Sequence, residues 1–341
     1  MNTLSVANTH WNVWGHAWAV QMLQQHIASA SVRHAYLFAG VDGIGKRTLA
    51  LAFAQALNCP EPISPGIPCG KCRVCIQIKE MKYVDLTIAQ ADSIGGTLKV
   101  DQVRALQHRI SLTAVEAQRK VAILLRFHEA NQNAQNALLK TLEEAPGNTV
   151  LILTAQAAES LLPTIVSRCE VLRLRPMRLI EATDTLHEHW QLSHEEAERM
   201  THLSGGRLGF ALRLRNQPEM HEQYREWLDD LEHLLKAPRR ERFRYSEKVS
   251  RASDREGLRS MLMVWLSYWR DIFLFTADGN AALQNCDRLE VLKKVGEQVG
   301  YDMALSCIRG IDQALEQVDA NVNQRLLLDT LLLDWPIVSS L

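Results

Sequence analysis

The 341-residue sequence lacks several features that would assign a protein to a class at once. It contains no run of 18 apolar residues, so we predict no transmembrane helix. Its 38 basic and 39 acidic residues give a net charge of -1, which argues against a protein that grips DNA over its whole surface. The N-terminal stretch has neither a basic start nor a long apolar core, so we expect no signal peptide and a cytoplasmic location.

Disulfide bonds are not expected either, although the chain has seven cysteines. Within "CPEPISPGIPCGKCRVC" four of them are separated by nine, two and two residues: Cys59, Cys69, Cys72 and Cys75. The two-residue spacing lets thiolates from one tight turn reach a single tetrahedral ion, which predicts a structural zinc site. An iron–sulfur site and four unliganded thiols are the alternatives, but residues 76–80 lack the further cysteine that an iron–sulfur site usually has. We expect the isolated Cys286 and Cys307 to be packed as small apolar groups.

Residues 34–58 have the pattern of a strand, a glycine-rich turn and a helix, in "HAYLFAG" and "KRTLALAFAQALN". That order is typical of the opening βα unit of a parallel sheet. The apolar runs "VDLTIAQ", "VAILL" and "NTVLILTA" are candidate buried strands, and "NAQNALLKTLEEA" predicts a helix that ends before Pro146 and Gly147. After Pro176 we predict helices only.

The turn itself, in "AGVDGIGKRTLA", has the features of a phosphate-binding loop. Gly40, Gly43 and Gly45 permit a tight turn whose N–H groups point at phosphate oxygens, and Lys46 would reach the β and γ phosphates. The Ser or Thr that normally follows the lysine and holds Mg²⁺ is absent. Arg47 stands there, and Thr48 lies about 100° further round the helix. A glycine-rich turn that binds nothing is the alternative.

The second half of an ATPase site, an Asp and usually a Glu at the end of a buried strand, is missing. Where the strand in "KVAILLRFHEAN" ends, the chain has Leu125 and Arg126, and we expect the later Glu129 to be solvated. Hydrolysis therefore lacks its hydroxyl, its metal-binding acid and its water activator. Because each such group typically contributes orders of magnitude to the rate, we predict no turnover.

With "HAYLFAGVDGIGK", "NAQNALLKTLEEAPGNTVLILTA" and "LLPTIVSRC", the sequence resembles the bacterial clamp-loader AAA+ family over about residues 11–177. The resemblance implies an α/β AAA+ domain at 1–176, with a RecA-like parallel sheet and a zinc module at 59–75. It also implies a small helical lid at 177–216 and an all-helical collar at 217–341. Such proteins assemble with gamma/tau and delta types of subunit of DNA polymerase III, and open a sliding clamp and close it around primed DNA.

In that family ATP lies at the joints between subunits, and the resemblance assigns one residue to a neighbour's site. Arg168, in Ser167-Arg168-Cys169, matches the arginine finger that contacts a neighbour's γ-phosphate. An arginine that satisfies a helix end or a surface ion pair is the alternative. The nucleotide-sensing arginine of the lid falls on Gly209, with Arg207 two residues earlier, and the core-strand threonine falls on Thr154 or Ala155.

We therefore predict a clamp-loader subunit without catalysis of its own, whose loop residues Gly40, Gly43, Gly45, Lys46 and Thr48 are vestigial or bind ATP weakly. Zinc is the predicted cofactor. One alternative is an active ATPase of the gamma/tau kind. The other is a stand-alone zinc-dependent nucleic-acid binder, against which the modest charge argues.

Overall fold

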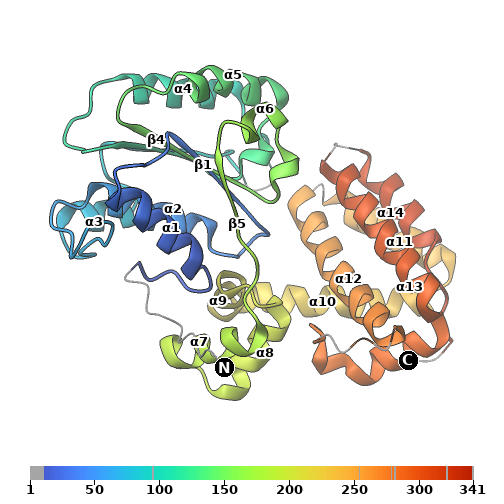
Figure 1. Cartoon of the computed structure of the whole chain (residues 1–341). Coiled ribbons are helices and arrows are strands. Elements are labelled where there is room, and N and C mark those ends of the chain that lie inside the picture. The colour runs from blue at the N-terminus through green and yellow to red at the C-terminus, as the bar shows by residue number, and fades with distance from the viewer. Residues whose placement is uncertain are drawn as a thin grey trace. The chain divides into compact units, whose positions relative to one another are not determined.

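The computed structural model describes residues 11–339 except 94, 95, 253, 278, 280, 281, 320 and 321. Most of the N-terminal stretch for which we expect no signal peptide lies outside the described residues. The chain divides into two compact units, Met1–Thr185 with Arg207–Phe210, and Leu186–Gly206 with Ala211–Leu341 (Figure 1). No helix in the described part is both long and apolar enough to cross a bilayer.

The part of the chain up to Arg173 alternates helices with five strands. Its α-helices are α1 (Ala17–Ala28), α2 (Lys46–Asn58), α3 (Arg73–Lys79), α4 (Val100–Ser111), α5 (Gln132–Glu143) and α6 (Pro163–Val166). Its strands are β1 (Ala35–Ala39), β2 (Leu86–Ala89), β3 (Lys120–Leu124), β4 (Thr149–Ala155) and β5 (Glu170–Arg173). Two 3-10 turns occupy Phe127–Glu129 and Ala158–Ser160. Every predicted strand and the predicted helix after Asn131 are present.

The strands form one parallel sheet in the order β2-β3-β4-β1-β5. Ala39 at the end of β1 pairs with Ala155, and Leu124 at the end of β3 pairs with Leu153. The carboxyl ends of β1, β3 and β4 therefore meet at one edge of the sheet. The phosphate-type loop follows β1 at that edge, where parallel α/β sheets generally bind ligands.

Helices cover both faces of the sheet, with α1 and α2 on one face and α4, α5 and α6 on the other (Figure 1). Alternate strand residues enter the two cores because successive side chains point to opposite faces. Phe38 and Ile123 pack with Phe53 of α2, whereas Leu37 and Leu124 pack with Leu138 of α5. Burial on both faces explains the continuous apolar runs in the sequence.

The rest of the described chain is helical, as predicted, and the α/β class followed by helices is confirmed. The helices are α7 (Leu179–Trp190), α8 (His194–Ser204), α9 (Leu208–Asn216), α10 (Pro218–Lys236), α11 (Arg239–Arg251), α12 (Arg255–Thr276), α13 (Leu289–Asp319, interrupted at Gly300) and α14 (Gln324–Leu333), with a 3-10 turn at Cys286–Arg288. The boundaries at 176 and 216 remain predictions.

The second unit has its own core, built on the apolar stripe of α12. Trp265 and Trp269 are fully buried and both pack against Trp335 in edge-to-face geometry. The buried Arg242 guanidinium donates hydrogen bonds to the carbonyl oxygens of Leu234, Leu332, Trp335 and Pro336. These contacts tie the segment after α14 to α10 and α11.

Candidate functional site

The loop between β1 and α2 has the backbone of a phosphate-binding loop. Gly43 and Gly45 have φ values of 76° and 107°, which a residue with a side chain adopts only with strain. Gly45 is the N-cap of α2, so the first N–H groups of the helix face the loop. The local fold expected from the glycine spacing is therefore present.

The lysine of this loop is turned back onto the loop's own backbone. The ammonium group of Lys46 donates a hydrogen bond to the carbonyl oxygen of Gly40 and another, 2.9 Å long, to that of Val41. Lys46 is only 8% exposed. The imidazole Nε2 of His16 lies 2.8 Å from the carbonyl oxygen of Ile44, and burial lowers the pKa of His16, so the neutral ring donates this bond.

The two residues after the lysine point away from the loop's core. Arg47 and Thr48 are exposed on the first turn of α2. The Arg47 guanidinium lies 2.8 Å from the sulfur of Met81. The exposure of Thr48 agrees with the expectation that its hydroxyl does not replace the one that normally holds Mg²⁺.

The start of α9 packs directly on the loop, and residues 207–210 belong to the first unit. A Cβ atom on Gly209 would lie 2.7 Å from the carbonyl oxygen of Gly43. The position that the resemblance assigns to the sensing arginine is thus held close to the loop by a glycine. The Arg207 guanidinium lies 4.4 Å from the centre of the Phe210 ring, in a cation–π contact.

The end of β3 contains an ion pair where an ATPase would hold its metal. Arg126 has a left-handed backbone (φ 51°), and its N–H donates to Thr154 Oγ1 at 2.8 Å. Its Nε lies 3.2 Å from a carboxylate oxygen of Glu129, and the two side chains are 24% and 12% exposed. The expectation that Glu129 is solvated is therefore wrong, because the 3-10 turn after β3 folds it back onto Arg126.

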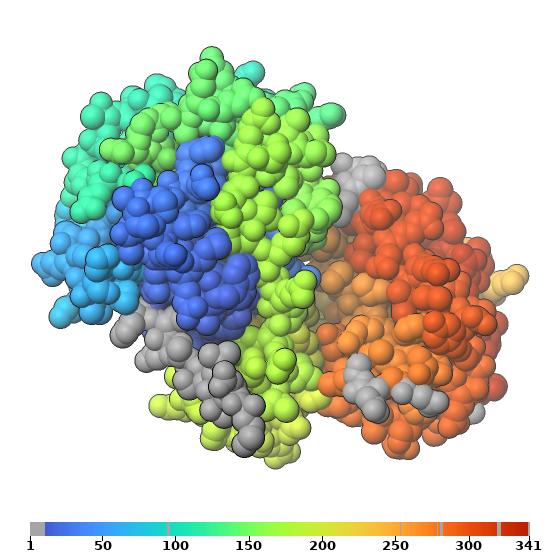
Figure 2. All heavy atoms as spheres, viewed as in Figure 1, coloured from blue at the N-terminus to red at the C-terminus, as the bar shows by residue number. Residues whose placement is uncertain are grey.

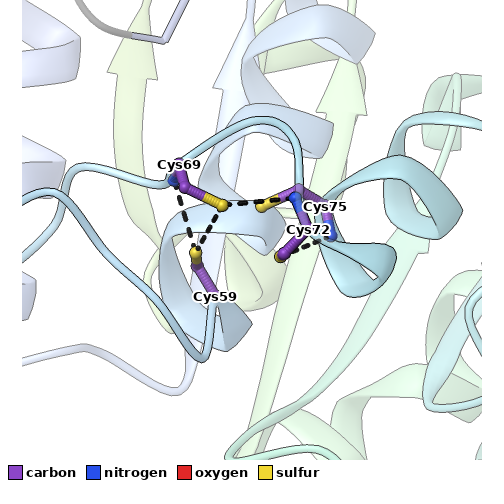
Figure 3. Close-up of side chains that lie close together, drawn as sticks. All are labelled: Cys59, Cys69, Cys72 and Cys75. Carbon is purple, nitrogen blue, oxygen red and sulfur yellow. Dashed lines mark hydrogen bonds between the residues drawn. The ribbon is translucent and has the colours of Figure 1, made fainter.

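The four clustered cysteines converge on a single point. Their sulfur atoms all lie within 4.8 Å of one another, and Figure 3 shows the side chains pointing inward. Cys59 is the C-cap of α2 and Cys72 the N-cap of α3, with Cys75 in the first turn of α3. This segment lies at the surface of the first unit, in light blue in Figure 2.

The surroundings of these sulfurs suit a cation. Backbone N–H groups point at three of them: that of Cys69 at Cys59, that of Cys72 at Cys69 and that of Cys75 at Cys72. The N–H groups of Lys71 and Cys72 lower the pKa of Cys69 to about 6, whereas burial raises the pKa of Cys59 and Cys75. A cation held between the sulfurs would favour all four thiolates, so these residues could hold a metal.

The two isolated cysteines have different environments. Cys307 is buried, as expected, but Cys286 is exposed. The expectation that both are packed is therefore wrong for Cys286, which lies in the 3-10 turn before α13. Burial of Cys307 follows from its place on a helix that packs against α12 and α14.

Arg168 follows α6 and lies at the surface, with 35% of its side chain exposed. Its Nη1 donates a 2.9 Å hydrogen bond to the carbonyl oxygen of Thr164. Its Nη2 donates a 2.7 Å bond to a carboxylate oxygen of Glu143, the last residue of α5. The guanidinium is therefore both accessible and held in place.

Comparison with known proteins places the chain among replication proteins. Residues 15–178 match the family described as DNA polymerase III, delta subunit, and residues 248–336 match the family of its C-terminal part. A DNA polymerase III subunit delta' from Pseudomonas aeruginosa is 32% identical over 333 residues, which cover 93% of this chain and 96% of that protein. This chain belongs to the DNA polymerase III delta' family.

Two further likenesses accompany this assignment. The DNA polymerase III subunit tau of Escherichia coli is 32% identical to this delta'-family chain over 166 residues, 49% of the chain and 25% of that protein. A solved gamma subunit-related protein from Thermotoga maritima is 17% identical with a TM-score of 0.48, covering 94% of this chain and 99% of that one. The match to the Pseudomonas aeruginosa protein confirms the family resemblance expected from the sequence strings.

Two contacts in this delta'-family chain involve partners that the sequence did not identify. One is Glu143, which pairs with Arg168 where the sequence offered only an unspecified helix end or surface ion pair as the alternative to a finger, and the other is Gly43, which Gly209 contacts. The two adjacent acids at the end of α5, where the helix dipole disfavours negative charge, were a signal for the first. The second has no local signal, because it depends on how distant segments pack.

Proposed function

We propose that the chain is a clamp-loader subunit that does not hydrolyse ATP and that donates Arg168 to ATP bound by a neighbouring subunit. Family membership supports the assembly with DNA polymerase III subunits of the gamma/tau and delta types. Through that assembly the chain acts on a sliding clamp and primed DNA in the cytoplasm.

The observation that carries the absence of hydrolysis is the Arg126–Glu129 ion pair at the end of β3. A magnesium-dependent site needs free carboxylates there, and this chain offers a guanidinium with a carboxylate already bound to it. Lys46 bonds to the loop's own carbonyl groups, and a glycine stands at position 209. Both observations support the proposal that the role of the loop is structural. Any ATP held at Gly40, Gly43, Gly45, Lys46 and Thr48 is bound weakly and not cleaved.

The cysteine cluster supports structural zinc. Four cysteine sulfurs within 4.8 Å of one another match the donor set that zinc prefers, and four protein ligands leave no open position for catalysis. Zinc measured in the purified protein in a 1:1 ratio tests this assignment. Iron and inorganic sulfide in place of zinc would contradict it.

The arginine assignment is tested by Arg168→Ala in a complex reconstituted with the gamma/tau and delta subunits. We expect DNA-stimulated ATP turnover to fall by roughly tenfold or more, because a finger stabilises charge on the transferring phosphoryl group. Arg173→Ala is the matched control, since Arg173 is also exposed and also paired with an exposed glutamate, Glu159. Turnover that is equal in the two variants would contradict the assignment.

The likeness to a tau subunit over half the chain supports a second candidate, an active ATPase of the gamma/tau kind. The two candidates differ in the isolated chain. ATP hydrolysis by the purified protein that Lys46→Ala abolishes would establish the second candidate, and no hydrolysis above a blank supports the first.

A further inference from the structure

The surface around Arg168 contains a carboxylate to which the proposed function gives no role. We infer that Glu143 is a positioning residue that holds the Arg168 guanidinium ready for a neighbour's nucleotide. This inference rests on the proposed function of Arg168. Glu143 itself touches no nucleotide and acts only through the arginine.

The contacts hold the guanidinium without using up its donors. Thr164 accepts one N–H from Nη1 and Glu143 accepts one from Nη2. A guanidinium carries more N–H groups than these two acceptors take, so the others remain available to a phosphate. Glu143 therefore fixes the orientation of the Arg168 guanidinium and leaves N–H groups of that guanidinium free to bind a phosphate.

Both acceptors stand on elements that the core fixes relative to each other. Glu143 ends α5, and Thr164 lies within α6. Leu138 and Leu142 of α5 share a buried cluster with Ile165 of α6. The packing of α5 on α6 therefore fixes the positions of the two acceptors. The long Arg168 side chain is flexible by itself, and the acceptors restrict it.

Glu143 is also poorly placed for the stability of its own helix. A carboxylate at a helix C-terminus faces the partial negative charge of the last carbonyl groups, which is unfavourable. Such a locally unfavourable residue marks a position where another requirement applies. The positive charge of Arg168 at 2.7 Å is the compensating partner.

Ordering the arginine in advance lowers the entropy that is lost when it engages the phosphate. An ordered Arg168 stabilises the transition state, in which charge develops on the phosphoryl group, more than it stabilises bound ATP. Glu143 should therefore affect kcat more than the KM for ATP. A residue that only stabilised the fold would instead reduce assembly or thermal stability.

The test uses Glu143→Gln and Glu144→Gln in the reconstituted complex. Glu144 is the matched control because it is exposed, adjacent and equally charged, and Arg168 bonds to Glu143 instead. We expect Glu143→Gln to lower the kcat of DNA-stimulated ATP turnover by roughly three- to tenfold, with KM for ATP and the assembled mass unchanged. Glu144→Gln should match the wild type.

The double variant separates this inference from the proposed function. In the Arg168→Ala background, Glu143→Gln should cause no further loss, because the two residues act as one unit. If Arg168→Ala leaves turnover unchanged, the proposed function fails. If Arg168→Ala lowers turnover, three results would contradict only the positioning role. Glu143→Gln could give the same turnover as Glu144→Gln or a higher one, or it could lower turnover further in the Arg168→Ala background.

Discussion

The two ends of helix α2 carry sites with opposite outcomes. At its start, Lys46 bonds to the loop's own carbonyl groups, and Gly209 packs on Gly43. At its end, Cys59 joins three further cysteines whose sulfur atoms lie within 4.8 Å of one another. At the first site the lysine binds protein carbonyl groups, and at the second four side chains that could hold a metal lie together.

The difference follows from what each ligand does for the chain. A structural metal contributes its binding free energy to folding, so loss of one cysteine destabilises the protein that carries it. A hydrolysed nucleotide contributes to catalysis and little to the fold. If a neighbour binds the nucleotide, as we propose, contacts within this loop can replace it without loss of stability.

The largest effect that would sharpen this comparison is expected at the cysteine end. Cys75→Ser removes a buried ligand and should weaken zinc binding by roughly 100-fold or more, since even outer contacts to metal ligands change affinity 10–100-fold. Zinc competition with a chromogenic chelator measures the affinity. Cys286→Ser, at an isolated exposed cysteine, is the control and should bind zinc like the wild type. Equal affinity in both variants would contradict a metal role.

A second effect is expected at the loop end when the sensing arginine is restored. Gly209→Arg places a Cβ 2.7 Å from the Gly43 carbonyl oxygen and should cost about 1–3 kcal/mol of stability through overpacking. Thermal and urea unfolding measure this loss. Gly147→Arg is the control, because no atom lies within 4 Å of its added Cβ. A Gly209→Arg protein as stable as the control would show that the close contact of residue 209 with Gly43 does not restrict the side chain at this position.

A smaller effect is expected at the ion pair after β3. Glu129→Gln leaves the partly buried Arg126 guanidinium without its carboxylate and should reduce the free energy of unfolding by about 1 kcal/mol. Glu80→Gln, which breaks a fully exposed pair with Lys82, should leave the urea midpoint unchanged within error. A gain in stability from Glu129→Gln would show that this ion pair does not stabilise the fold.

The smallest effect is expected from Lys46→Ala. If the loop no longer serves nucleotide, its affinity for a fluorescent ATP analogue should be weak and change by less than about twofold. Binding is measured by anisotropy on the isolated chain. Tight binding of the ATP analogue that the substitution abolishes would contradict the difference between the two ends of α2, because both ends would then hold ligands.

Much of the fold could be predicted because its signals are local. Helix α2 spans the predicted residues Lys46–Asn58, and each apolar run became a strand, since burial on both faces of a sheet leaves a continuous pattern. The environment of Glu129 was predicted wrongly because it depends on the left-handed backbone of Arg126, which no sequence pattern indicates. Cys286 was misjudged because an isolated cysteine carries no pattern that reveals its burial.

By itself, the sequence determined the order of strands and helices, the glycine loop and the spacing of the four cysteines. These depend on neighbours within a few residues, where backbone geometry and side-chain periodicity act directly. Only the tertiary structure brought Gly209 onto Gly43 and Glu143 to Arg168, 25 residues away. Such contacts arise from the packing of separate elements on one core, so no short stretch of sequence encodes them.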